Sequence, residues 1–212
     1  PISVITLSEC AELARGLAKR IFEELQIPCY CYEAAAFKPE RKNLAVCRSG
    51  EYEALVEKVC DPERKPDFGP GKYTDVVAKS GAINVGARNF LVAVNFNLNT
   101  TSTRRAMAVA FDVREKGRKM REGGSLTGKV LKDENGNDLW QPGTLKGCKA
   151  IGWYIDEYGI AQVSMNITDI EATSLHEAYE EVCRAASLRG LKFTGTEIVG
   201  LVRKRVLMDA GR

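Results

Sequence analysis

The chain has 212 residues, enough for one large domain or two small ones, and its 44% hydrophobic and 28% charged residues are ordinary for a globular protein. The net charge of +3 is too small to indicate a nucleic-acid partner, and no apolar run is long enough to predict a membrane span. Seven cysteines, an odd number without a CxxC repeat, indicate neither a disulfide framework nor a metal site, so we expect a reducing, cytoplasmic compartment.

The first predicted element is a helix of about five turns. Thr6 and Glu9 have the spacing of a capping box, which marks a helix N-terminus. Apolar side chains then recur at helical spacing, at Leu13, Leu17, Ile21 and Leu25. Pro28 ends this pattern, and the "CYCY" that follows predicts a short strand.

Residues 43–59 have a helical pattern interrupted at Gly50, and "DPERKPDFGPGK" after them predicts a loop. Residues 1–88 thus contain too few strands to close a sheet. We expect them to be the remainder of an N-terminal α/β subdomain whose beginning precedes Pro1.

Residues 89–212 have a more regular pattern. Ser174 and Glu177 form a second capping box, at the start of the second helix of this portion. The predicted order is strand 90–98, helix 102–116, strands 149–156 and 160–168, helix 174–190 and strand 196–202. This βαββαβ order predicts a ferredoxin-like C-terminal subdomain, and the fold class of the chain is α+β.

The long connection before residue 149 contains "VLKDENGNDLW". Asn135-Gly136 is a strong signal for a two-residue turn, so we expect a protruding β-hairpin here.

The first strand of this portion, "FLVAVNFNLN", alternates between two kinds of side chain. One face is apolar from Phe90 to Leu98, whereas the other carries Asn95, Asn97 and Asn99. The third strand repeats this pattern, with Gln162 and Asn166 in its polar row. In a βαββαβ unit these two strands are neighbours, so their polar rows share the face that the helices leave uncovered.

Two interpretations of this polar face remain open. It could simply meet water, as one side of many antiparallel sheets does. Solvated strand faces usually carry charges, however, and uncharged amides suit a partly closed ligand groove, which we favour. A nucleic-acid platform would need stacking aromatic residues on these strands and an RNP-type run, and neither is present.

Seven segments in order resemble one known family across essentially the whole chain. They are "GEYEAL", "PDFGP", "VGARNFLVAVNFNL", "IGWYIDE", "AQVSMNITD", "LHEAYEEVCRAA" and "IVGLV". The sequence is similar to the formiminotransferase domain, glutamate formimidoyltransferase. The resemblance implies two subdomains whose sheets enclose a folate-binding groove, and a transfer of the formimino group from N-formimino-L-glutamate to N5 of tetrahydrofolate in histidine degradation.

The resemblance also implies partners and site residues. Tetrahydrofolate is the co-substrate, both substrates are small molecules, no nucleic acid or membrane is involved, and a homodimer is an allowed assembly. The family's folate loop corresponds to residues 69–81, with Gly69, Pro70, Gly71, Lys72, Tyr73 and Gly81 as candidates. Because this sequence is slightly longer there, residues 74–80 have no one-to-one counterpart.

Polar groove contacts are expected from Asn95, Asn97, Gln162 and Asn166. Lys72 and Arg88 are candidates for the carboxylates of the two anionic ligands, although Arg88 could equally pair with an acidic side chain.

Formimino transfer needs a group that moves a proton, a role suited to histidine. The one histidine, His176, lies in the second turn of a capped helix, where a structural role is the commoner explanation. The family's catalytic histidine belongs to an "HPRMGA"-type segment that this sequence lacks, so we expect an N-terminally truncated enzyme and assign no catalytic residue. A non-catalytic folate-binding module and a formyl transferase of the same family are the alternatives.

Overall fold

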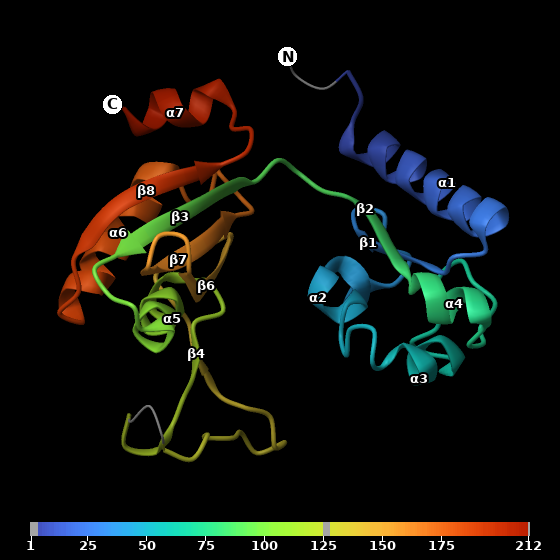
Figure 1. Cartoon of the computed structure of the whole chain (residues 1–212), viewed down its shortest axis with the longest axis horizontal. Helices are drawn as coiled ribbons and strands as arrows, with labels where there is room; N and C mark the ends of the chain where they lie inside the picture. The colour runs from blue at the N-terminus through green and yellow to red at the C-terminus, as the bar shows by residue number, and fades with distance from the viewer. Residues whose placement is uncertain (1–3, 125–127, 212) are drawn as a thin grey trace. The chain divides into compact units, whose positions relative to one another are not determined.

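The structure is a computed structural model that describes residues 4–124 and 128–211. It divides into two compact units, residues 1–89 (unit 1) and 90–212 (unit 2), which are described separately (Figure 1). None of the helices in these described ranges is both long and apolar enough to cross a membrane.

Unit 1 is built on two parallel strands, β1 (Cys29–Glu33) and β2 (Ile83–Ala87), packed against the long helix α1 (Leu7–Leu25). Thr6 caps α1 through the expected capping box with Glu9. The buried face of α1 consists of alanines, whereas Leu13 and Leu17 are 65% and 52% exposed. The leucine repeat therefore predicted the helix correctly but does not mark the side that packs.

Short helices complete unit 1. They are η1 (Pro39–Lys42), α2 (Leu44–Cys47), α3 (Leu55–Cys60) and α4 (Asp75–Ser80). Gly50 separates α2 from α3 with a φ of +77°, as the interrupted pattern predicts. Helix α4 was not expected, because a loop was predicted at its position. Thr74 caps it by accepting a hydrogen bond from the Val77 N–H.

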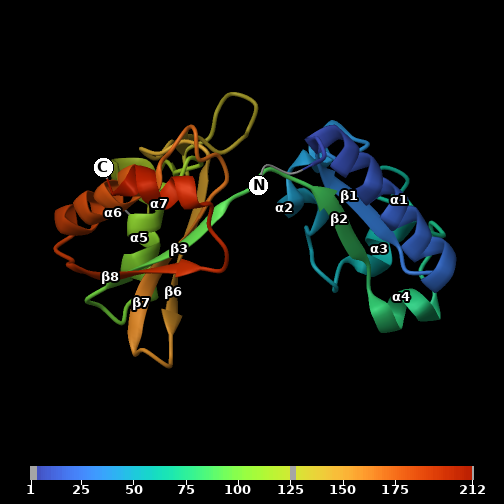
Figure 2. The same ribbon diagram turned by 90° about the horizontal axis from the view of Figure 1, so that it is seen from above.

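Unit 2 contains a four-stranded antiparallel sheet in the order β6-β7-β3-β8 (Figure 2). Its strands are β3 (Val92–Leu98), β6 (Cys148–Ile155), β7 (Ile160–Ile167) and β8 (Phe193–Val199). The first and third of these strands, β3 and β7, lie side by side in the middle, as expected. Phe90 was expected in the apolar stripe of β3, but it precedes the strand and is 55% exposed.

Helices α5 (Thr103–Val113) and α6 (Leu175–Leu188) cover one face of this sheet. Val94 and Phe96 on β3 and Met165 on β7 are buried in one core with Val109 of α5 and Val182 of α6. Helix α6 begins at the predicted capping box. Helix α5 ends three residues before the predicted 116, because the backbone turns to extended geometry at Arg114. The last helix, α7 (Lys204–Ala210), was not predicted.

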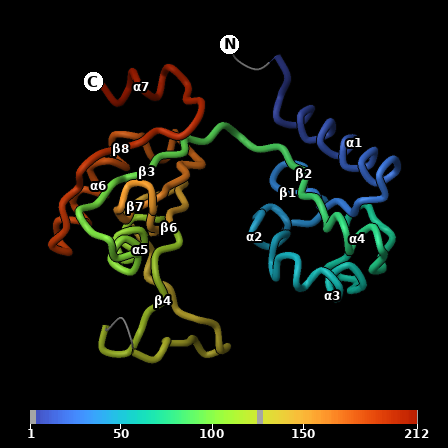
Figure 3. The backbone as a smooth tube through the Cα atoms, viewed as in Figure 1, coloured from blue at the N-terminus to red at the C-terminus, as the bar shows by residue number. Residues whose placement is uncertain are grey.

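A long arm, residues 118–124 and 128–141, leaves the sheet between α5 and β6 (Figure 3). Its base is a short ladder of β4 (Arg118–Lys119) with β5 (Trp140–Gln141), and η2 (Glu122–Gly124) follows β4. The chain reverses near Asn135-Gly136 as expected, but the predicted two-residue turn is wrong. Lys132 pairs with Asp138, and inside this pair the Asp133 N–H donates to the Asn137 carbonyl at 2.8 Å, so the loop consists of residues 134–136. The Asp133 carboxylate accepts the Asn135 and Asn137 N–H groups.

Candidate functional site

The candidate site is the face of the unit 2 sheet that α5 and α6 leave open, called here the open face. Strand register puts Asn95 and Asn97 of β3 on this face, between Gln162 of β7 and Glu197 of β8. The apolar residues that alternate with them point into the helix-covered core. The predicted separation of polar and apolar rows on these strands is thus confirmed.

Hydrogen bonds tie the amides of the open face together across three strands. Asn95 Nδ2 donates to Glu197 Oε2 at 3.0 Å, and Gln162 Nε2 donates to Asn97 Oδ1 at 2.5 Å. Asn95 is 6% exposed and Gln162 is fully buried, although neither lies beneath the helices. These side chains are therefore fixed in orientation and largely desolvated, unlike amides on a wet sheet surface.

The second polar atom of Gln162 lacks a partner. Within residues 4–124 and 128–211, its buried Oε1 accepts no hydrogen bond. An unsatisfied buried acceptor costs about 1–3 kcal/mol, so it usually has a specific cause. Since Gln162 is fully buried, a ligand N–H group could satisfy this acceptor only after a neighbouring side chain moves aside.

Apolar side chains surround this polar centre. Trp153 of β6 stands directly opposite Gln162 in the register and is 40% exposed. Ile151 and Val199, on the outer strands of the same face, are 51% and 46% exposed. A planar heterocycle could stack on the indole while its polar edge bonds to the amides.

The remaining predicted residues of unit 2 lie outside this hydrogen-bonded centre. Asn166 is on the open face but exposed. His176 is on the surface of α6, 55% exposed, and its Nε2 lies 3.1 Å from Glu180 Oε1.

In unit 1 the predicted folate loop is partly helical. Gly71 and Gly81 have positive φ angles of 60° and 68°, and α4 occupies most of the stretch between them. Thus the residues without a counterpart in the family's loop form a helix. Gly69 is half-buried, whereas Pro70 and Lys72 are exposed.

Tyr73 is fixed by another tyrosine of unit 1. Its hydroxyl lies 3.5 Å from that of Tyr52, which also donates to the Ala78 carbonyl in α4. The hydrogen bond with Tyr52 raises the pKa of Tyr73 above its usual range. At the end of β2, Arg88 is exposed and its Nη1 donates to the Asn89 carbonyl at 3.2 Å.

Sequence reasoning missed Glu197 and Trp153. Both follow the same two-residue alternation as the amides, and that signal was present in the sequence. Glu197 was missed as a partner because only the register of β8 against β3 shows that it stands opposite Asn95.

The described residues contain no candidate metal site. No group of three or more His, Cys, Asp or Glu side chains in the described part of the chain could hold a metal ion. All seven cysteines are free.

Comparison with known proteins gives matches over the whole chain. Residues 93–212 match the model of the formiminotransferase domain, and residues 1–88 match that of its N-terminal subdomain. A formimidoyltransferase-cyclodeaminase of Sus scrofa is 43% identical over 211 residues, which are 99% of this chain and 35% of the relative. A glutamate formimidoyltransferase of Streptococcus pyogenes is 35% identical over 209 residues, or 99% of this chain and 60% of the relative.

A glutamate formimidoyltransferase of Thermoplasma acidophilum is likewise 35% identical, over 100% of this chain and 61% of its own length. The chain thus spans about a third of the length of the animal relative and about three fifths of the other two. With family models matching both units, the chain belongs to the formiminotransferase domain family.

Proposed function

We propose that this chain takes part in the transfer of the formimino group from N-formimino-L-glutamate to tetrahydrofolate. Two relatives named glutamate formimidoyltransferase match the chain over essentially its whole length, which supports a formimino donor over a formyl donor and an enzyme over a pure binding module. We further infer that residues 89–212 form a ferredoxin-like C-terminal subdomain and that residues 1–88 belong to the N-terminal subdomain. We also infer from the free cysteines that the protein is cytoplasmic.

We place the pterin ring of tetrahydrofolate on the open face of unit 2. The observation that carries this placement is the buried, unpartnered Gln162 Oε1 beside the ordered Asn95 and Asn97 amides. A reduced pterin has several N–H donors along one edge and a flat face. The half-buried Glu197 would accept from that edge, and Trp153 would stack on the ring. Gln162 would accept only once a side chain that buries it moves aside.

In this proposal the residues of the open face bind and orient the co-substrate. N5 of tetrahydrofolate attacks the formimino carbon and loses its proton, and the glutamate nitrogen accepts a proton as it leaves. The amides hold N5 in position for the attack, a contribution that comes from geometry rather than from proton transfer. The predicted ligand contacts of unit 1 remain Lys72, Arg88 and the stretch from Gly69 to Gly81.

Calorimetric titration of tetrahydrofolate into the chain tests this proposal. Wild type is compared with the double variant Asn95→Ala/Asn97→Ala and with Asn135→Ala, an exposed control in the arm. The double variant should bind about tenfold more weakly or worse, because it loses two oriented amides, and the control should bind normally. Circular dichroism should show that the double variant stays folded.

Equal binding by all three proteins would contradict the placement. Unfolding of the double variant would show instead that the amides are structural. In that case Gln162→Met, which leaves the Asn95–Glu197 hydrogen bond intact, becomes the deciding variant.

A further inference from the structure

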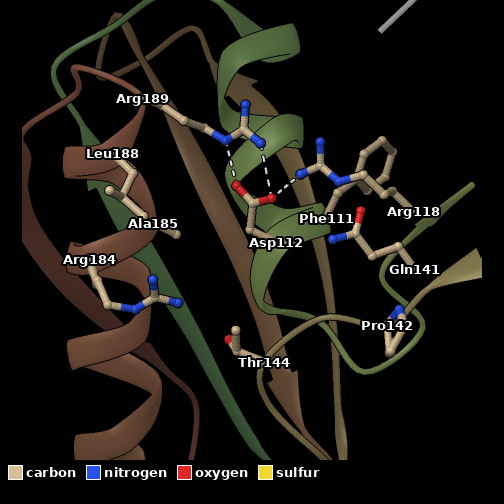
Figure 4. Close-up of a pocket in the computed structure, with 10 residues that line it drawn as sticks. All are labelled: Phe111, Asp112, Arg118, Gln141, Pro142, Thr144, Arg184, Ala185, Leu188 and Arg189. Carbon is tan, nitrogen blue, oxygen red and sulfur yellow. Dashed lines mark hydrogen bonds and ion pairs between the residues drawn. The ribbon is translucent and has the colours of Figure 1, made fainter. Parts of the chain in front are cut away.

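A second concave site lies on the helix side of unit 2, across the sheet from the open face. It is a pocket of about 380 Å³ between α5, α6 and the base of the arm (Figure 4). Its polar lining comes from Asp112 of α5, Arg118 of β4, Gln141 of β5, Thr144, Arg184 of α6 and Arg189, the C-terminal cap of α6. Because the pocket and the amides lie on opposite faces of one sheet, the pocket is separate from the proposed pterin site.

Two guanidinium groups bind one carboxylate in this pocket, and a third also lines the pocket. Arg189 binds Asp112 through both Nε and Nη2, the latter at 2.9 Å from Oδ1, and Arg118 Nη2 binds the same oxygen. Arg184 does not contact Asp112 but pairs with Glu181 through Nε at 3.0 Å and Nη2 at 2.8 Å. Figure 4 shows Arg184 and Arg189 on α6 and its C-terminal cap, and Arg118 on a separate segment.

The two carboxylates do not use all the donors of these arginines. Within the described ranges, four of their nitrogen atoms donate no hydrogen bond. These are Nη1 of Arg184, Nη1 of Arg189, and Nε and Nη1 of Arg118. The Arg118 and Arg189 side chains are only 20% and 27% exposed, so water screens their charges less than at an open surface. Burial also lowers the pKa of Arg118, so an additional negative charge nearby would favour its charged form.

The helix ends at this pocket would repel an anion if their carbonyl groups were free. At the end of α5, the Asp112 and Val113 carbonyls accept the N–H groups of Thr144 and Leu145. At the end of α6, the Arg189 carbonyl accepts a hydrogen bond from Arg105 Nη2 at 2.8 Å. Because these carbonyls are already hydrogen-bonded, the charges of the arginines dominate the electrostatic potential in the pocket.

We propose that this pocket binds a small oxyanion, a phosphate or carboxylate group, on the free N–H groups of Arg118, Arg184 and Arg189. Guanidinium groups fit both oxyanions because their paired N–H bonds match the spacing of the oxygens. The bound anion would connect α5, α6 and the base of the arm.

Arg184→Gln is the most informative variant. It removes one guanidinium from the pocket but leaves both arginines on Asp112, so the fold keeps its paired carboxylate. The matched control is Arg48→Gln in unit 1, because Arg48 is 55% exposed, Arg184 is 50% exposed, and each pairs with a glutamate three residues away.

Inorganic phosphate is titrated into wild type and both variants by calorimetry, with sodium chloride adjusted to hold the ionic strength constant. We expect saturable binding by wild type and by Arg48→Gln, and about tenfold weaker binding by Arg184→Gln. A parallel titration with glutamate identifies the source of the oxyanion, since a tighter glutamate isotherm points to a carboxylate ligand and a tighter phosphate isotherm to a phosphoryl ligand.

Two results would overturn the proposal. One is the absence of saturable binding of either anion by wild type, and the other is equal binding by wild type and Arg184→Gln. The Asn95→Ala/Asn97→Ala variant should bind phosphate as wild type does, because its substitutions lie on the opposite face of the sheet.

Discussion

Gln162 combines complete burial with an unsatisfied acceptor, an arrangement that reduces stability unless a ligand uses it. In the free protein, Gln162→Met removes the unpaired oxygen but also the hydrogen bond that Gln162 Nε2 donates to Asn97. The two effects should offset, so the free energy of unfolding should change by less than about 1 kcal/mol. The same substitution should weaken tetrahydrofolate binding. Urea unfolding and calorimetry on one preparation measure both effects.

Asn166→Leu is the control for stability, because Asn166 occupies the same polar row of β7 but is exposed. Its unfolding free energy should change little. A loss of more than about 2 kcal/mol in Gln162→Met would mean that the amide stabilises the sheet, which would remove the argument for a ligand at Oε1.

Tyr30 is a second buried polar residue whose hydroxyl lacks a partner among the described residues. Burial raises the pKa of Tyr30 to about 12, from 10.0 in a solvated tyrosine. Between these two values the unfolded chain releases the phenolic proton while the folded protein keeps it. The stability that Tyr30 contributes is therefore fully present below pH 10 and is lost as the pH rises toward 12.

We predict that Tyr30→Phe is as stable as wild type at pH 7 and more stable at pH 12, by about 2 kcal/mol. Urea unfolding at a series of pH values gives the difference between the two proteins, and the buried cysteines contribute equally to both. Tyr158→Phe, at a 58% exposed position, should show no such divergence. Parallel stability curves for wild type and Tyr30→Phe would contradict the assignment.

At the scale of elements, replacing a glycine by alanine should have opposite effects on stability in α1 and in β6. Gly16 lies within α1 with no atom within 4 Å of the position of a Cβ, whereas a Cβ on Gly152 would lie 2.0 Å from the backbone nitrogen of Met107 in α5. Gly16→Ala should stabilise the protein by about 0.5–1 kcal/mol, because alanine favours a helix.

Gly152→Ala should destabilise it by about 1–3 kcal/mol, because α5 must move away from β6. Urea unfolding distinguishes these signs. Destabilisation by Gly16→Ala would contradict the open surroundings of Gly16, and an unchanged stability of Gly152→Ala would contradict the close packing of α5 on β6.

The elements that the sequence predicts best are those with a local cause. Both capping boxes, Thr6 with Glu9 and Ser174 with Glu177, mark true helix starts, because the capping side chain and the helix it begins are neighbours in the chain. Helices α4 and α7 have six and seven residues, too few for a clear periodic pattern, and were missed. The turn at Asn135-Gly136 is a loop of three residues instead of two, held by the Asp133 carboxylate, which accepts the Asn135 and Asn137 N–H groups.

At the scale of the whole molecule, the sequence predicts those features of the candidate site that follow from the two-residue alternation of a strand. The rows containing Asn95 and Gln162 follow from that alternation and from the neighbouring places of β3 and β7. The Asn95–Glu197 hydrogen bond depends on residues 102 positions apart, and the fully buried state of Gln162 depends on packing. Neither can be deduced from local pattern.

The most direct test of the central claim, that the open face of unit 2 binds the pterin of tetrahydrofolate, is a nuclear magnetic resonance titration of the side-chain N–H signals. The NH₂ groups of Asn95, Asn97 and Gln162 and the indole N–H of Trp153 report on the face itself. We predict that all four signals shift in a saturable manner as tetrahydrofolate is added, whereas the Asn135 NH₂ signal in the arm stays in place. Saturable binding that leaves the four signals unmoved would contradict the account.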